Sequence, residues 1–343
     1  MVTPLSETAL VVTSISAPNP ALKACADGCR QYGIDFFVVG DTKSPDDFSL
    51  DGCQFMSIEN QRRMSWRLAS LLPERHYARK NLGYLAAMAQ GAKTIIETDD
   101  DNFPRESFWQ ERVRGQRVPL VTGCGWTNVY RYFTDAMIWP RGFPLEHIHA
   151  PVPDLETIES REVFCPIQQG VADDNPDVDA VYRLNRELPQ RFDPAAKVAL
   201  GVGSWSPFNS QNTTWFQEAF PLLYIPSHCS FRMCDIWRSF IAQRICWANG
   251  WGVLFHGPSV YQERNEHDLM RDFADEVPGY LNNSRICETL AGLDIVAGGG
   301  HAADNLRLCY RAFVGLGLIG EKEMPLLEAW LEDVAMLSGA GPR

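Results

Sequence analysis

The stretch that decides the fold is Ile95-Ile96-Glu97-Thr98-Asp99-Asp100-Asp101-Asn102, in which three carboxylates directly follow a short apolar run. This pattern predicts a buried strand that ends in an acidic turn. Open α/β sheets bind ligands outside the carboxyl ends of their strands, so a site is expected at this turn. Adjacent carboxylates repel one another unless a cation or strong donors neutralise them. Asp99 and Asp101 point to the same side of an extended chain and could share one Mg²⁺ or Mn²⁺. The alternative is a solvated acidic turn.

A helix is predicted just upstream of this strand. Apolar residues at 82, 85, 86 and 89 follow helical spacing, and Gly91 is a natural end point. Arg79 and Lys80 fall at the N-terminus of the helix, where the macrodipole already favours anions. We therefore expect both cations to contact a diphosphate held against the acidic turn. The alternative is that they are two surface cations.

The first forty residues predict a β-α-β unit. Residues 9–16 and 36–41 are apolar runs with strand character, and a helical pattern that closes near Gly33 lies between them. Thr13, Ser14 and Asp41 come at the ends of the two strands, where a base and a ribose could be held. The absence of a glycine-rich phosphate loop weakens the dehydrogenase and kinase interpretations.

Composition limits the partners and the compartment. The chain has 343 residues and a net charge of -12, which argues against nucleic acid or an anionic membrane as the main partner. No segment reaches the roughly 20 apolar residues needed to span a bilayer. No basic region precedes Leu10, so a signal peptide is not expected. The ten cysteines form no C-x-x-C pair. Scattered cysteines of this kind are usually reduced, which favours a cytoplasmic location.

Three later segments carry further candidate ligands. Residues 168–179 form a second acidic cluster, in which we assign Asp174 to substrate binding. Asp177 and Asp179 could instead cap the following helix. Residues 207–213 are dense in neutral hydrogen-bonding groups, and among them we assign Asn212 to substrate binding. In the segment 231–238 we assign Arg238 to substrate binding.

The same motifs, in this order, resemble the STELLO-type proteins, which are GT-A glycosyltransferases. The similarity rests on Ala-Arg-Lys-Asn-Leu-Gly-Tyr-Leu, Glu-Thr-Asp-Asp-Asp-Asn, Pro-Phe-Asn-Ser-Gln-Asn-Thr and Phe-Arg-Met-Cys-Asp-Ile-Trp-Arg. It covers roughly residues 75–105 and 165–268. The Arg-containing helix before the Asp triplet is more distantly similar to the reversibly glycosylated polypeptides, which are UDP-arabinopyranose mutases.

The resemblance implies a GT-A fold, a twisted mixed α/β sheet flanked by helices that binds a nucleotide sugar. It implies a metal-dependent glycosyltransferase of the Asp-x-Asp type, with a UDP-sugar as the favoured donor and a glycan or small molecule as acceptor. Mn²⁺ or Mg²⁺ would bind Asp99, Asp101 and a later histidine, His267, with His256 in reserve. Asp100 would bind substrate. Asp235 would be the catalytic base, and its alternative role is to cap a helix.

Two other functions are compatible with the same residues, and the chain is expected to have two regions. A nucleotide-sugar mutase could use the same residues, and a non-catalytic nucleotide-sugar-binding protein would need no base. Residues 1–267 are predicted to form the nucleotide-sugar-binding and catalytic domain. Residues 268–343 are predicted to form a helical region packed on it, because apolar residues recur there at three- and four-residue spacing.

Overall fold

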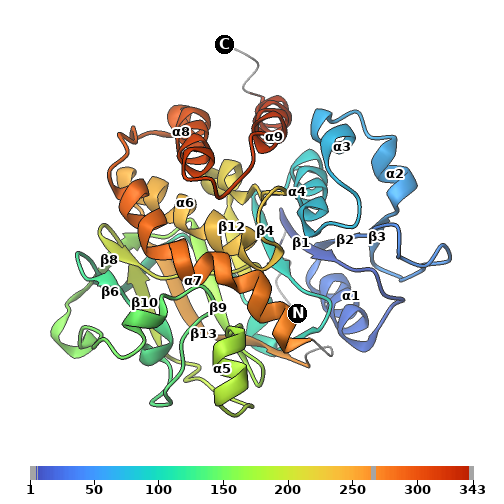
Figure 1. Ribbon diagram of the computed structural model, residues 1–343. Helices are drawn as coiled ribbons and strands as arrows, with labels where there is room; N and C mark the ends of the chain where they lie inside the picture. The colour runs from blue at the N-terminus through green and yellow to red at the C-terminus, as the bar shows by residue number, and fades with distance from the viewer. Residues whose placement is uncertain (1–4, 6, 264–267, 340–343) are drawn as a thin grey trace.

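The computed structural model describes residues 5, 7–263 and 268–339. Within them, eleven strands form one mixed sheet in the order β3-β2-β1-β4-β12-β9-β13-β10-β6-β8, and β5 pairs with β13 (Figure 1). The strands are β1 (Thr8–Thr13), β2 (Asp35–Val39), β3 (Gln54–Met56), β4 (Thr94–Thr98), β5 (Asn102–Pro104), β6 (Gly115–Val121), β8 (Ser160–Phe164), β9 (Ile167–Asp173), β10 (Lys197–Leu200), β12 (Asn212–Phe216) and β13 (Val253–Gln262). A separate pair joins β7 (Gly125–Trp126) to β11 (Ser204–Trp205).

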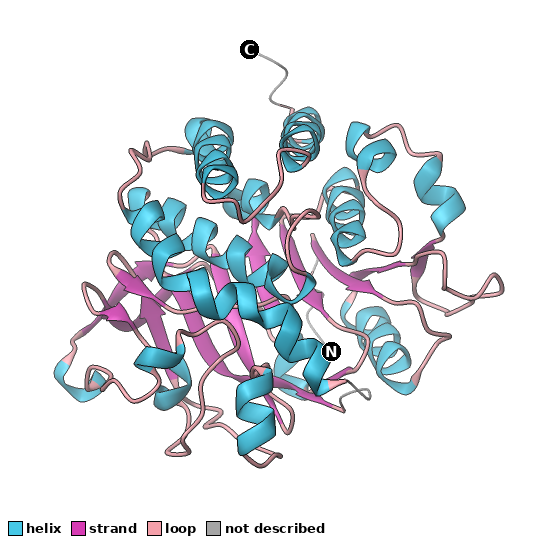
Figure 2. Ribbon diagram, in the orientation of Figure 1, coloured by secondary structure: helices cyan, strands magenta, loops and turns pink. Residues whose placement is uncertain are grey.

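The N-terminal half of the sheet is parallel. β1 pairs in parallel with β2 and with β4, and β2 pairs in parallel with β3. Their carboxyl ends therefore meet at one edge, as the sequence predicts. β12 enters antiparallel between β4 and β9, so its first residue, Asn212, lies opposite Thr98 at the same edge. The predicted α/β class, with a mixed sheet and flanking helices, is confirmed (Figure 2).

Helices cover both faces of the sheet. They are α1 (Pro20–Tyr32), α2 (Ile58–Arg62), α3 (Arg67–Leu71), α4 (Lys80–Ala89), α5 (Ala180–Asn185), α6 (Cys234–Ala248), α7 (Leu269–Ala291), α8 (Ala302–Gly315) and α9 (Glu323–Leu337). Alternate residues of β1 face opposite sides. Leu10 packs in the cluster that contains α1, and Val11 packs in the large cluster that contains α4, α6, α8 and α9.

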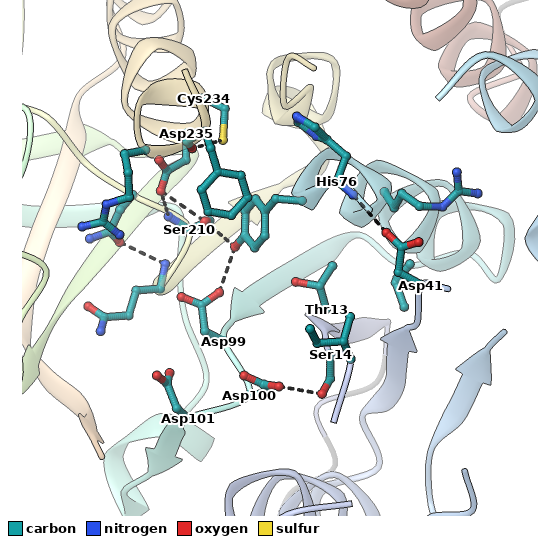
Figure 3. Close-up of a pocket in the computed structure, with 18 of the residues that line it drawn as sticks. Thr13, Ser14, Asp41, His76, Asp99, Asp100, Asp101, Ser210, Cys234 and Asp235 are labelled. Carbon is teal, nitrogen blue, oxygen red and sulfur yellow. Dashed lines mark hydrogen bonds between the residues drawn. The ribbon is translucent and has the colours of Figure 1, made fainter. Parts of the chain in front are cut away.

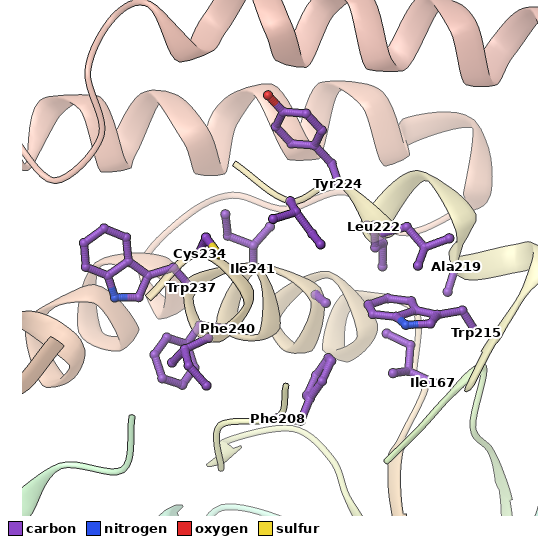
Figure 4. Close-up of a cluster of buried hydrophobic side chains, with 14 of the residues drawn as sticks. Ile167, Phe208, Trp215, Ala219, Leu222, Tyr224, Cys234, Trp237, Phe240 and Ile241 are labelled. Atoms are coloured by element: carbon purple, nitrogen blue, oxygen red, sulfur yellow. The ribbon is translucent and has the colours of Figure 1, made fainter. Parts of the chain in front are cut away.

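Helix α6 is the centre of the large core. Figure 4 shows it between Tyr224, which points toward the C-terminal helices, and Phe208 on the side of the sheet. Tyr224 packs against Tyr310 of α8 and Trp330 of α9. The helical character predicted for the C-terminal region is therefore present, and these helices pack on the rest of the chain. The proposed division at residue 267 falls in the segment 264–267, outside the described residues, and stays a prediction.

Local capping explains where α1 begins and ends, and a capped turn leads into α4. The Asn19 side chain accepts a hydrogen bond from Leu22 N at the start of α1, and Gly33 ends that helix with φ 68°. α4 follows a single 3-10 turn, η1 (Tyr77–Arg79), that His76 caps. No helix in the described ranges has the length and apolar character that crossing a bilayer requires.

Candidate functional site

A cavity of about 490 Å³ lies at the sheet edge where β1, β2 and β4 end. Its lining includes the acidic turn after β4, the residues that follow β1 and β2, and side chains from the segments before β12 and α6 (Figure 3). A volume of this size suits a ligand as large as a nucleotide. The cavity therefore brings together several of the residues that the sequence selects.

The acidic turn is tied down by hydrogen bonds from three directions. Tyr77 Oη donates to Asp99 Oδ1 at 2.8 Å, and Ser14 Oγ donates to Asp100 Oδ2 at 2.5 Å. Gln262 Nε2 donates to Asp101 Oδ1 at 3.0 Å. Removal of water from around Asp99 raises its pKa to about 6, an effect that Lys80 opposes and Asp101 reinforces. Asp99 and Asp101 thus disfavour each other's charge, as adjacent carboxylates do without a cation between them.

The acidic turn offers carboxylate oxygens to a divalent cation, but no complete set of ligands among the described residues. In the part of the chain that is described, no three His, Cys, Asp or Glu side chains converge so as to hold a metal by themselves. Asp99 Oδ2 accepts no hydrogen bond from a described residue, because both donors reach Oδ1. Mg²⁺ is commonly bound by one or two carboxylates together with substrate phosphates and water. The donor set fits a hard cation that arrives with a phosphate-bearing ligand.

Thr13, Ser14 and Asp41 line the cavity beside the acidic turn, as predicted for the base and ribose region. Asp41 shapes this end, because its Oδ1 accepts from Thr42 N at 2.7 Å and its Oδ2 accepts from His76 N at 3.0 Å. The carboxylate thus fixes the loop after β2 to the segment that leads into α4. Burial lowers the pKa of His76, whose Nδ1 accepts a hydrogen bond from Ala78 N.

Arg79 and Lys80 are buried rather than displayed on the surface, so the surface-cation alternative is wrong for both. Arg79 lines the cavity and is 2% exposed, with Nε donating to Gln61 Oε1 at 2.6 Å. Its Nη2 is buried without a hydrogen-bond partner among the described residues. Lys80 is fully buried and donates to Tyr77 Oη and Thr98 O, both at 2.8 Å. Its Nζ lies 3.4 Å from Asp99 Oδ1, so Lys80 stabilises the acidic turn from inside the protein. Lys80 does not line the cavity, so the predicted contact of Lys80 with a diphosphate is wrong: the ammonium group is used by Tyr77, Thr98 and Asp99.

The opposite wall of the cavity is built around a buried guanidinium group. Arg141 Nη2 donates to Asp235 Oδ2 at 2.9 Å, and its Nε donates to Asp177 Oδ1 at 2.8 Å. Asn209 Nδ2 donates to Asp177 Oδ2 at 2.8 Å, and Ser210 Oγ lies 3.3 Å from Asp235 Oδ2. Burial alone would raise the pKa of Asp177, but Arg141, Arg232 and the hydrogen bond from Asn209 lower it to about 2. One cation thus joins two carboxylates that face the cavity.

Asp235 is placed in this wall by the start of α6. The helix begins at Cys234, and the residue in the capping position, Met233, makes no side-chain cap. Asp235 lies within the first turn, and its side chain reaches no helix N–H beyond that of Ile236. The capping alternative is therefore wrong, and the catalytic role stays a prediction.

Besides Lys80, three further residues assigned to substrate binding lie outside the cavity lining. Arg238 is 1% exposed and donates to Glu97 from both terminal nitrogens, because one turn of α6 carries it away from Asp235 and into the core. Asn212 is buried in β12, where its side chain contacts Val171 O and Ser259. Asp174 follows β9 in a bridge to Gln190 and pairs with Arg191 at 3.3 Å.

Neither proposed histidine ligand is supported by the structure. His267 lies outside the described residues. His256 belongs to the middle of β13, where it lies 2.9 Å from Gly257 O and does not line the cavity. Burial lowers its pKa to about 4.

The sequence reasoning missed part of the site. Arg141, Ser210 and Tyr77 line the cavity but were not selected, and Asp177 was interpreted only as a cap. Arg141 lies in a loop region without regular structure, so nothing in its neighbourhood in sequence marks it. Asp177 could have been found, because it stands in the acidic cluster three residues after the aspartate that was chosen.

Comparison with known proteins places these motifs in context. The model of a family described as STELLO glycosyltransferases matches residues 232–342. Two Arabidopsis thaliana proteins, STELLO2 and STELLO1, both named as probable glycosyltransferases, are 28% and 29% identical to this chain over 97% of its length. The chain spans about half the length of these curated relatives, 45% in each case.

Two solved structures show a looser likeness. A mycobacterial protein aligns over 81% of this chain and 74% of its own, with 11% identity and a TM-score of 0.41. The glucosyl-3-phosphoglycerate synthase of M. tuberculosis aligns over 81% of this chain and 80% of its own, with 11% identity and a TM-score of 0.39.

Proposed function

We propose that this chain, which is similar to the STELLO glycosyltransferases, transfers a glycosyl group from a nucleoside-diphosphate sugar, with a UDP-sugar as the favoured donor. The observation that carries the proposal is the cavity at the ends of β1, β2 and β4, which contains all three carboxylates of the acidic turn. Open α/β sheets bind nucleotides at this kind of edge. The proposal includes dependence on Mn²⁺ or Mg²⁺.

The donor would lie along the ends of the parallel strands. Its base and ribose would contact Thr13, Ser14 and the loop fixed by Asp41, and Arg79 Nη2 offers a buried donor that no described residue uses. The diphosphate would lie at Asp99 and Asp101, which would hold the cation. A divalent cation bound there would stabilise the negative charge that develops on the leaving diphosphate.

The acceptor hydroxyl would approach Asp235. In the transfer, the bond between the anomeric carbon and the phosphate oxygen breaks, and its electron pair leaves with the diphosphate. A bond from the acceptor oxygen to that carbon forms, and the hydroxyl proton passes to Asp235. Arg141 supports this role, because it remains paired with Asp177 when Asp235 becomes neutral.

The experiment is a calorimetric titration of the chain with UDP, and in parallel with GDP, in Mg²⁺ and in EDTA. We expect binding in Mg²⁺ and a loss of at least tenfold in EDTA, because Asp99 and Asp101 otherwise repel the diphosphate. Asp101→Asn should weaken the Mg²⁺-dependent binding. Asp51→Asn, which alters an exposed aspartate outside the cavity, is the matched control. Equal affinity in Mg²⁺ and EDTA would contradict the proposal.

A further inference from the structure

Two large apolar side chains stand exposed in the cavity lining, Ile15 after β1 and Phe231 before α6, and only Phe231 is aromatic. Phe231, at the start of the short turn η7 (Phe231–Met233) before α6, lines the cavity and is 53% exposed. Its ring meets those of His76 and Tyr77 at steep angles, with centroids 6.3 and 6.2 Å away. The ring is thus held by two aromatic contacts while more than half of the residue faces solvent. A large apolar side chain exposed in a polar cavity marks a surface that a ligand covers.

The position of Phe231 assigns it to the acceptor side. It comes four residues before Asp235, and the backbone between them is fixed because Ser230 O accepts from Met233 N at 2.9 Å. Arg141 also donates to Arg232 O, which ties the same turn to the guanidinium that holds Asp235. Contacts lead from the ring to the same carboxylate: Tyr77, which packs on Phe231, lies 2.6 Å through its Oη from Ser210 Oγ, and Ser210 Oγ lies 3.3 Å from Asp235 Oδ2. A molecule lying on Phe231 would therefore be close to the carboxylate proposed to take the acceptor proton.

The two cations next to Phe231 and Asp235, Arg141 and Arg232, are already paired within the protein. Arg141 is shared between Asp177 and Asp235, and its three guanidinium nitrogens all donate to described residues. Arg232, the other cation beside Phe231, lies 2.9 Å from Glu276 and 3.9 Å from Asp272. Even without Asp272, the three carboxylates of Asp177, Asp235 and Glu276 face these two described cations. An anionic acceptor beside Asp235 would thus meet repulsion, because the remaining cations of the cavity lining, Lys43, Arg75 and Arg79, belong to the segments that follow β2 and precede α4.

We propose that the acceptor is a neutral sugar whose ring lies against Phe231 and whose reacting hydroxyl points to Asp235. A sugar ring presents apolar C–H groups on its faces and hydroxyls at its rim. The faces suit the phenyl ring, and the rim suits the carboxylates and hydroxyls of Asp177, Ser210 and Asp235. This inference rests on the proposed function, because it takes the second substrate of a glycosyl transfer as the ligand.

The test is saturation-transfer NMR on the full chain with Mg²⁺ and UDP. The probes are methyl glycosides of glucose, galactose, mannose, xylose and arabinose, with glucose 6-phosphate and mannose 6-phosphate as anionic counterparts. We expect at least one neutral glycoside to bind and its phosphorylated counterpart, where there is one, to bind at least tenfold more weakly. Phe231→Ala should weaken the neutral sugar about tenfold, and Phe231→Trp should retain it. The matched control is Phe164→Ala, because Phe164 is 37% exposed but does not line the cavity.

The outcomes separate this inference from the function beneath it. If UDP binds by calorimetry and no neutral glycoside gives a signal, the inference is wrong while the proposed donor site stands. Equal binding of a sugar and its phosphate, or an unchanged affinity in Phe231→Ala, would also overturn it. If UDP itself does not bind, the proposed function fails whatever the sugars do.

Discussion

The contacts of Asp235 distinguish a helix-capping role from a role in the cavity. Its carboxylate accepts two hydrogen bonds from Arg141 and lies within reach of Ser210. An N-cap aspartate would instead accept from a backbone N–H two or three residues on, and Asp235 does not. The environment is therefore that of a held carboxylate in a cavity wall, which suits a group that must accept a proton from a bound molecule.

We predict that Asp235→Asn lowers nucleotide-sugar turnover by a factor of about 10² or more and leaves donor affinity unchanged, because an amide cannot take the acceptor proton. Stability should change little, since Asp177 continues to pair with Arg141. The measurement is the rate of nucleotide-sugar hydrolysis beside the calorimetric affinity for UDP. Asp154→Asn is the control, because Asp154 is an exposed aspartate that caps a turn away from the cavity. A wild-type rate in Asp235→Asn would remove the residue from the mechanism.

A second residue-scale prediction concerns Asp179, which is fully buried and caps α5. Burial raises its pKa to about 7, although Tyr182 N and Trp139 Nε1 donate to it. The unfolded value is near 3.9, so the folded protein binds this proton more tightly between pH 4 and 7. The Asp179 contribution to the free energy of unfolding therefore falls as pH rises through that window.

Denaturant unfolding at pH 5 and pH 8 tests this expectation. Wild type should lose more stability between the two values than Asp179→Asn, because the amide does not ionise. Asp154→Asn again serves as control and should follow wild type. The same loss in Asp179→Asn as in wild type would show that Asp179 does not titrate in this range.

At the scale of elements, the connection between β4 and α6 passes through one buried ion pair. Glu97 of β4 and Arg238 of α6 are 0% and 1% exposed at their side chains, with Nη2 and Oε1 2.7 Å apart. Trp215 Nε1 also donates to Glu97 Oε1 at 2.8 Å. The strand that carries the acidic turn is thus locked to the helix that carries Asp235, so the two halves of the cavity are held in register.

We predict that Glu97→Ala costs about 3–5 kcal/mol of unfolding free energy, because it leaves the Arg238 charge buried without its partner. The double variant Glu97→Leu/Arg238→Met should recover much of that loss and retain UDP binding. Glu218→Ala is the control, since Glu218 pairs with Arg114 near the surface and such pairs contribute about 1 kcal/mol or less. If the double variant folds but no longer binds UDP, Arg238 has a role in binding that its position in the core does not indicate.

These elements also show what the sequence could predict. β1, β2, β4 and α4 follow from apolar runs and helical spacing, because each buries one or two faces against neighbours close in the chain. Where a charged side chain lies in the fold, and what it pairs with, does not follow from these patterns. Arg238 and Arg79 look alike in sequence, yet one pairs with Glu97, 141 residues away, and the other lines the cavity. Only the three-dimensional packing of distant segments decides between these outcomes.

At the scale of the whole molecule, the cavity is the place where segments from most of the chain meet. The sequence places Thr13, Asp41 and the acidic turn at one sheet edge, because parallel strands end together. The opposite wall could not be predicted in the same way. Arg141 reaches it from an irregular loop, and Phe231 reaches it from a single turn, neither of which has a periodic pattern.

The measurement that tests the central claim most directly is the fate of a nucleotide sugar incubated with the full chain. UDP-glucose, UDP-galactose, UDP-arabinopyranose and GDP-mannose would be supplied with Mn²⁺ and, in parallel, with EDTA, and the nucleotides separated by chromatography. Our account predicts that at least one donor releases its nucleoside diphosphate in Mn²⁺, slowly with water and faster with a neutral sugar, and that EDTA stops the release. If every donor stays intact in Mn²⁺ while UDP binds to the cavity, the chain is a binding protein and the assignment of transfer chemistry to Asp235 is wrong.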